Sequence, residues 1–131
     1  MLVAYDCWLR INEVSGLTVA DVYDTRGQVD PVGRGVSVFL DETKTGRPQA
    51  VALEEPAVAA LLLTLARAQG QRTARLFPAP DKLRRVLACC LEALNVEAHG
   101  LMFVWHGFRH SGASRAFVRG DEISSILVRG R

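Results

Sequence analysis

Two short segments separated by a turn sequence constrain the fold of this chain most strongly. Residues 36–42 (VSVFLDE) carry the β-branched residues typical of a strand, and residues 49–54 (QAVALE) supply a returning strand after the turn TKTGRP at 43–48. This arrangement predicts a β-hairpin. The segment TVADVYD (18–24) predicts a further short strand, and the Gly/Pro-rich residues 25–35 predict the loop that follows it.

Helical signals flank the hairpin on both sides. Apolar spacing, Pro at a first helical position, Gly after a last one and Asp before a first one predict five helices. These are 7–17, ending near Gly16; 56–69, between Pro56 and Gly70; 82–95, N-capped by Asp81, with Leu83, Val86, Leu87, Leu91 and Leu94 apolar; 106–118, ending at Gly120; and 122–128, capped by Asp121. Helices around a small antiparallel three-stranded sheet make a mainly helical α+β fold, which we expect to be a single domain over 1–131.

Composition limits where the protein works. Hydrophobic residues make up 49% of 131 residues, enough for a real core, and the longest apolar run is too short to span a bilayer. The N-terminus lacks the features of a signal peptide. The cysteines are odd in number and two are adjacent, which is typical of a reducing compartment rather than of a disulfide framework. We therefore expect an intracellular protein, in a prokaryotic cytoplasm or a eukaryotic nucleus, without a membrane partner.

Several familiar catalytic patterns are incomplete here. The KTG at 44–46 lacks the Ser-x-x-Lys of β-lactamases, and the GRG at 33–35 lacks the rest of a phosphate loop. His106 and His110 are one helical turn apart, but no Glu follows His106 as in zinc proteases, and adjacent cysteines chelate poorly. The sequence therefore predicts no metal site and no cofactor.

The first candidate functional residues are basic side chains in the N-terminal half of the chain. Arg10 and Glu13 are spaced i,i+3 on one predicted helix, so Glu13 can orient the guanidinium of Arg10; the alternative is an ordinary surface ion pair. Lys44 lies at the tip of the predicted hairpin, where it can reach a phosphate oxygen; the alternative is a common turn lysine.

A second pair of candidates lies in the stretch WHGFRHSGASRAF, residues 105–117. His106 and Arg109 share one face near a predicted helix N-terminus, which favours anions. The small residues that follow them predict a helix that packs closely against its neighbours. The alternative is a buried histidine bonded to a carbonyl, with Arg109 paired to a carboxylate.

Taken together, these segments resemble the tyrosine recombinase (phage integrase) catalytic domain. LRINEVSGLTVADV is similar to the first arginine motif of that family and TKTGRPQAVAL to its lysine hairpin. HGFRHSGASRAFVRG is similar to its His-x-x-Arg-His helix, and ISSILVRGR to the helix that leads into its Gly-His or Gly-Trp motif. The motifs occur in the family's order and cover nearly the whole chain. The final VRGR is most similar to recombinases of mobile elements, including retrotransposons.

The resemblance implies a role for each candidate residue. Arg10 and Arg109 would hold the non-bridging oxygens of a scissile DNA phosphate, and Glu13 would support Arg10. Lys44 would protonate the leaving 5′-oxygen, and His106 would assist proton transfer. Preorganised donors of this kind stabilise the charge that develops on phosphate oxygens, without a metal ion. The implied activity is DNA cleavage and rejoining through a 3′-phosphotyrosyl intermediate, by an enzyme that forms a homo-oligomer on DNA.

The chain departs from the family at the nucleophile. Its two tyrosines, Tyr5 and Tyr23, match no nucleophile position, and Arg131 stands at or just before the sixth active-site residue. We therefore expect a C-terminally truncated domain that binds phosphate but does not cleave DNA. Three alternatives remain: a DNA-binding or oligomerisation module without chemistry, a relative of type IB topoisomerases, and an unrelated α+β domain.

Overall fold

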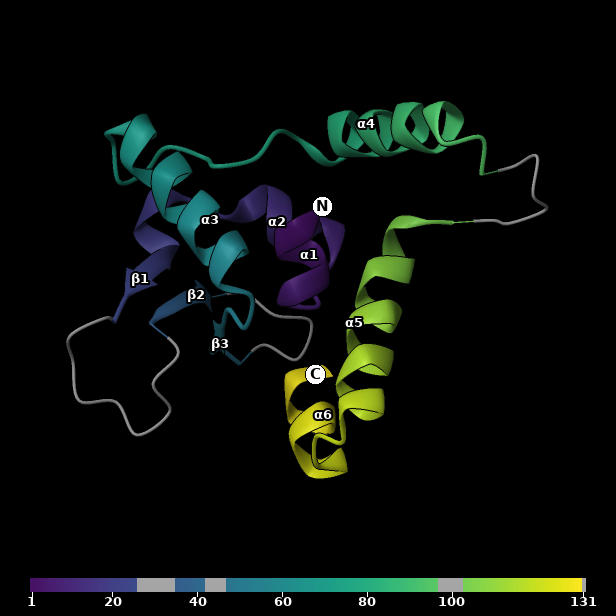
Figure 1. Cartoon of the computed structure of the whole chain (residues 1–131). Helices are drawn as coiled ribbons and strands as arrows, with labels where there is room; N and C mark the ends of the chain where they lie inside the picture. The colour runs from purple at the N-terminus through teal and green to yellow at the C-terminus, as the bar shows by residue number, and fades with distance from the viewer. Residues whose placement is uncertain (26–34, 42–46, 97–102, 131) are drawn as a thin grey trace.

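A three-stranded antiparallel sheet packs against helices (Figure 1). The computed structural model describes residues 1–25, 35–41, 47–96 and 103–130. The helices are α1 (Leu2–Asp6), α2 (Ile11–Gly16), the 3-10 helix η1 (Val19–Asp21), α3 (Pro56–Gln69), α4 (Pro80–Ala93), α5 (Trp105–Arg119) and α6 (Ile123–Gly130). The strands are β1 (Val22–Asp24), β2 (Val36–Leu40) and β3 (Gln49–Ala52). The predicted α+β class is confirmed.

The sheet has the order β1-β2-β3, with Val38 of β2 paired to Val22 on one side and to Val51 on the other. The predicted hairpin is therefore present, with strands shorter than expected. The first strand covers only Val22–Asp24, because the carboxylate of Asp21 accepts hydrogen bonds from the backbone N–H and the hydroxyl of Thr18, both at 2.8 Å. Such local side-chain bonds compete with strand pairing and favour the 3-10 turn.

The helix α1 lies between α3 and α5 at the centre of the molecule, and α6 packs against α5 (Figure 1). The helix α4 extends along the outside and contacts α2. The most deeply buried large side chains come from the turn between α1 and α2, from α2 and its C-cap, from β2 and from α3: Cys7, Leu9, Val14, Leu17, Val38 and Leu62. The core thus connects the N-terminal segment to the sheet and to α3.

The helix predicted over 7–17 is wrong at its start. Only α2, Ile11–Gly16, lies in this range, and residues 7–10 connect it to α1, which the sequence pattern does not predict. The chain leaves α1 after Asp6, turns at Trp8 in the left-handed conformation (φ 56°) and enters α2 at Ile11. A left-handed residue other than Gly breaks a right-handed helix, so one continuous helix cannot form here. The predicted end near Gly16 is confirmed.

The helices predicted to end at Gly70 and Gly120 are both present. The helix α3 begins at Pro56 and ends before Gly70, and α5 ends before Gly120. Both glycines are left-handed, with φ of 69° and 89°. Gly adopts this C-terminal conformation without the steric cost that a Cβ imposes, which is why these ends were predictable.

The helix α4 corrects two further predictions. It begins at Pro80, so Asp81 lies inside the first turn and bonds to Arg84 at 2.7 Å instead of serving as N-cap. Leu83 and Leu87 are buried as expected, and Leu91 is partly buried against the core. The other two residues predicted to be apolar contacts, Val86 and Leu94, are 45% and 70% exposed.

The last helix, α6, also begins later than predicted. It starts at Ile123, two residues after Asp121, and the carboxylate of Asp121 pairs with Arg119 of α5. None of the residues of α6, Ile123–Gly130, is buried. Polar contacts must therefore provide much of the attachment of this helix.

Candidate functional site

Arg10 stands at the junction that precedes α2, where its backbone is extended (φ −70°, ψ 156°). Glu13 contacts it twice. One carboxylate oxygen, Oε2, accepts the backbone N–H of Arg10 at 2.7 Å, and the other, Oε1, accepts the guanidinium Nη1 at 2.9 Å. The side chain of Glu13 is 7% exposed and that of Arg10 is 28% exposed. The predicted pair is therefore a half-buried, fixed arrangement.

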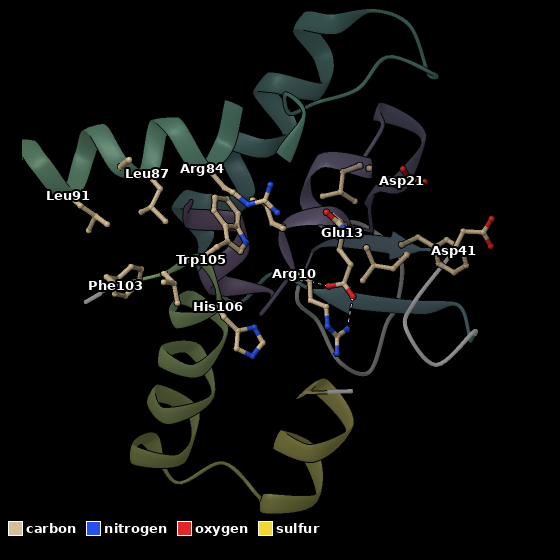
Figure 2. A pocket seen from close by; sticks show the side chains of 18 residues that line it. Arg10, Glu13, Asp21, Asp41, Arg84, Leu87, Leu91, Phe103, Trp105 and His106 are labelled. Atoms are coloured by element: carbon tan, nitrogen blue, oxygen red, sulfur yellow. Dashed lines mark hydrogen bonds and ion pairs between the residues drawn. The ribbon is translucent and has the colours of Figure 1, made fainter. Parts of the chain in front are cut away.

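A cavity of about 1110 Å³ opens beside Arg10, between α2, β2, α4 and the start of α5. Its apolar wall includes Leu87, Leu91, Phe103 and Trp105. In Figure 2 the guanidinium of Arg10 and the imidazole of His106 lie toward the same edge of the cavity, away from this apolar wall. The volume lies just above the usual range of small-molecule sites, about 300–1,000 Å³, and leaves room for a segment of a larger ligand.

The cavity is not uniformly basic. Asp21 and Asp41 also line it, on the opposite side from His106 (Figure 2). The edge that holds Arg10 and His106 is thus the part best suited to an anion. In the apolar wall, and within the part of the chain that the structure describes, the buried indole Nε1 of Trp105 has no hydrogen-bond partner.

His106 is exposed in the first turn of α5, and its ring meets the ring of His110 edge to face, with centroids 4.5 Å apart. The pKa of His106 is lowered, first by partial desolvation and then by the positive charges of His110, Arg109 and Arg10. The imidazole is therefore neutral at neutral pH.

Arg109 is 9% exposed and points inward rather than toward solvent. Its Nη1 donates a hydrogen bond to the backbone carbonyl of Trp8 at 3.0 Å. Arg109 is absent from the residues that line the cavity. The structure therefore brings Arg10, Glu13 and His106 to one cavity, whereas Arg109 bonds to Trp8 and does not line it.

The small residues of α5 have the predicted packing role at Gly112. A Cβ at this position would contact the indole of Trp8, 2.5 Å from Nε1, and would lie 2.5 Å from the carbonyl oxygen of Tyr5. Real Cβ atoms do not approach other atoms this closely. The helix α5 therefore lies against α1 and Trp8 at a distance that only Gly allows.

Two of the predicted site residues, Lys44 and Arg131, lie outside the described residues. Their predicted roles stay predictions. His110, expected to be a packing residue beside the site, is exposed. Among the described residues, no group of three or more His, Cys, Asp or Glu is placed to hold a metal ion.

Sequence reasoning missed an arginine that ties the C-terminal helix to the rest of the chain. Arg129 of α6 bonds to Glu54 Oε1 at 2.6 Å and donates to the carbonyls of Asp6 at 2.6 Å and Ala52 at 3.0 Å. Its guanidinium also lies 5.1 Å from the ring centroid of Trp8. No local pattern distinguishes Trp8 or Arg129, because their partners are distant in sequence.

Comparison with protein-family models, curated proteins and solved structures finds no match to the chain. Among the described residues, no helix is both long enough and apolar enough to cross a membrane.

Proposed function

We propose that this chain is the catalytic domain of a DNA strand-exchange enzyme of the tyrosine recombinase type, with the corresponding fold, and that it binds a DNA phosphodiester. One observation supports the proposal above all. Arg10 and His106, from opposite ends of the chain, line the same cavity, and Arg109 acts on the same imidazole. The motif resemblance assigns these three residues to one phosphate.

The chemistry of the site suits this role. Arg10 offers a guanidinium that Glu13 holds in one orientation, which favours planar recognition of two phosphate oxygens. A neutral imidazole has one N–H donor and one acceptor nitrogen. His106 is therefore able to donate a hydrogen bond to a phosphate oxygen and to accept one from a hydroxyl. These groups are already positioned before the phosphate binds, so less conformational entropy is lost on binding.

We expect binding without strand cleavage from this chain. Tyr5 lies beneath the guanidinium of Arg115, at 5.8 Å from its ring centroid, and Tyr23 is 48% exposed on β1. Neither tyrosine lines the cavity that contains Arg10 and His106. Neither tyrosine is therefore placed to act as the nucleophile for transesterification at this cavity. Such a protein would work where DNA is found, in a prokaryotic cytoplasm or a eukaryotic nucleus.

A second candidate function is a DNA-binding or oligomerisation module derived from a mobile-element recombinase. The position of both tyrosines outside the cavity favours it. Apolar side chains also lie exposed on the last two helices, including Phe117, Ile123 and Leu127 at 65%, 63% and 70%. In this second function the chain still binds phosphate and forms a homo-oligomer on DNA, but it catalyses no reaction.

Fluorescence anisotropy with duplex DNA tests the proposal. We expect affinity to fall steeply with salt, because phosphate contacts release counterions. Arg10→Ala removes a charge-assisted contact and should weaken binding about tenfold. Arg67→Ala is the matched control. It removes the same charge, and Arg67 lies on α3 with a side chain that is 71% exposed. Equal losses in the two variants, or binding that does not respond to salt, would overturn the proposal.

A second assay separates the two functions. The protein is incubated with DNA that carries an activated phosphate at a nick and with a small phenol as external nucleophile, and strand breakage is followed on a denaturing gel. Breakage that Arg10→Ala abolishes supports a recombinase site that lacks only its nucleophile. Salt-sensitive binding with no breakage supports the module.

A further inference from the structure

We infer that Trp8 is a positioning residue for the phosphate site, because its carbonyl orients Arg109 and its indole keeps that carbonyl in place. This inference rests on the proposed function. Nothing in the sequence motifs gives Trp8 a role. It follows from three contacts that meet at this one residue, with Arg109, Gly112 and Arg129.

The first observation concerns the backbone of Trp8. Its φ of 56° is in the left-handed region, which a large aromatic residue rarely adopts and which persists only where neighbouring contacts stabilise it. The turn is closed on either side by hydrogen bonds from Cys7 N–H to Val3 O at 2.9 Å and from Leu9 N–H to Ala4 O at 3.0 Å. The carbonyl of Trp8 itself faces α5 and accepts Nη1 of Arg109 at 3.0 Å.

The second observation concerns the indole, which is 4% exposed. On one side the ring lies against the backbone of α5 at Gly112, where a Cβ would come within 2.5 Å of Nε1. On another side lies Arg129 of α6, whose guanidinium is 5.1 Å from the ring centroid. The ring is therefore held by two helices from the C-terminal part of the chain, and it cannot rotate without displacing one of them.

These contacts link Trp8 to the site from two directions. Along the chain, Trp8 precedes Arg10 by two residues. The turn at Trp8 therefore sets the position of Arg10 at the start of α2. Through space, its carbonyl holds Arg109, which is one helical turn after His106. A guanidinium is planar and carries five N–H donors, so a bond from one of them to a fixed carbonyl restricts the directions in which the other donors point.

The competing explanation is that Trp8 only fills the core. The two explanations differ in what happens to His106, because the positive charge of Arg109 contributes to its lowered pKa. A loss of core packing alone lowers stability and leaves Arg109 where it is. A loss of positioning moves that charge and lets the pKa of His106 rise.

The experiment compares three variants by NMR titration of His106 and by DNA binding. Trp8→Gly keeps the left-handed backbone accessible and removes the ring. Arg109→Met shows the pKa of His106 without the guanidinium charge. Leu62→Ala, in α3 and 2% exposed, is a stability control in the core away from the site.

We expect Trp8→Gly to shift the pKa of His106 in the same direction as Arg109→Met and to weaken DNA binding at least threefold, whereas Leu62→Ala changes neither. A folded Trp8→Gly protein that titrates and binds DNA like Leu62→Ala would overturn the inference. If His106 shifts as expected but neither wild type nor variant binds DNA, the positioning role stands and the proposed function fails.

A measurement on the wild-type protein covers the case in which Trp8→Gly does not fold. In ¹⁵N-arginine spectra, rotation about the Nε–Cζ bond of Arg109 should be slow, and that of the exposed Arg85 on α4 should be fast. Equally fast rotation of the two guanidinium groups would show that the carbonyl of Trp8 does not fix Arg109, and the inference would be wrong.

Discussion

The carboxylate of Glu13 contacts both ends of Arg10, its backbone N–H at 2.7 Å and its guanidinium at 2.9 Å. One side chain thus satisfies a free N–H at the start of α2 and orients the arginine that we assign to phosphate. The dual contact couples the local stability of α2 to the proposed binding function. Substitutions of Glu13 should therefore change both properties together.

Glu13→Gln preserves the size of the side chain but removes its charge. We expect the free energy of unfolding to fall by about 1 kcal/mol, because a charge-assisted bond becomes a neutral one at a nearly buried position. DNA affinity should fall severalfold as Arg10 loses its fixed orientation. Urea denaturation and anisotropy measure the two effects. Glu92→Gln, on the exposed surface of α4, is the control, and an equal effect there would contradict the prediction.

The lowered pKa of His106 predicts how DNA binding depends on pH. A bound phosphate adds negative charge beside the imidazole and raises its pKa, so the complex takes up a proton that the free protein does not hold. Affinity for DNA should therefore increase as the pH falls from 7 toward 5. His106→Gln should remove this part of the pH dependence in anisotropy titrations, and an unchanged profile in that variant would refute the assignment.

The same residue predicts how stability depends on pH. Because the pKa of His106 is lower in the folded chain than in the unfolded chain, the unfolded chain takes up the proton first as the pH falls. The free energy of unfolding should thus decrease as the pH falls below about 6.5. His110→Gln removes one of the opposing charges and should raise the pKa of His106, which NMR titration measures directly.

Gly112→Ala should destabilise the protein by about 2 kcal/mol or more, because the added Cβ collides with the indole of Trp8 and with the backbone carbonyl of Tyr5. Gly107→Ala is the matched control in the same helix. A Cβ there would meet only the ring edge of Phe103, at 2.9 Å, and that side chain is able to shift. Thermal unfolding measures both variants, and equal losses would show that α5 does not depend on the close approach at Gly112.

Arg129→Met should detach α6 from the body of the protein. The variant loses the ion pair to Glu54 and both carbonyl contacts, while α6 itself buries no residue. We expect a loss of about 2 kcal/mol and faster hydrogen exchange of amides over residues 123–130. Arg67→Met, which removes a long ion pair at 3.8 Å on α3, should leave exchange in α6 unchanged.

The sequence by itself determined those elements whose ends depend on local chemistry. Pro56, Gly70 and Gly120 set helix ends through backbone preferences that act within a few residues, and the hairpin follows from two strand segments around a turn. The pairing of Arg10 with Glu13 was predictable for the same reason, because i,i+3 spacing places both side chains on one face.

Only the tertiary structure decided the features that depend on residues far apart in the chain. The helix predicted from residue 7 begins only at Ile11, after a left-handed turn at Trp8 whose carbonyl bonds to Arg109 and whose ring packs against α5 and Arg129. Val86 and Leu94 have helical apolar spacing but stay exposed, because spacing defines a face and cannot supply the partner that covers it. The spacing of apolar residues reflects the local geometry of a helix or strand. The burial and direction of a side chain depend on which segments of the chain pack together.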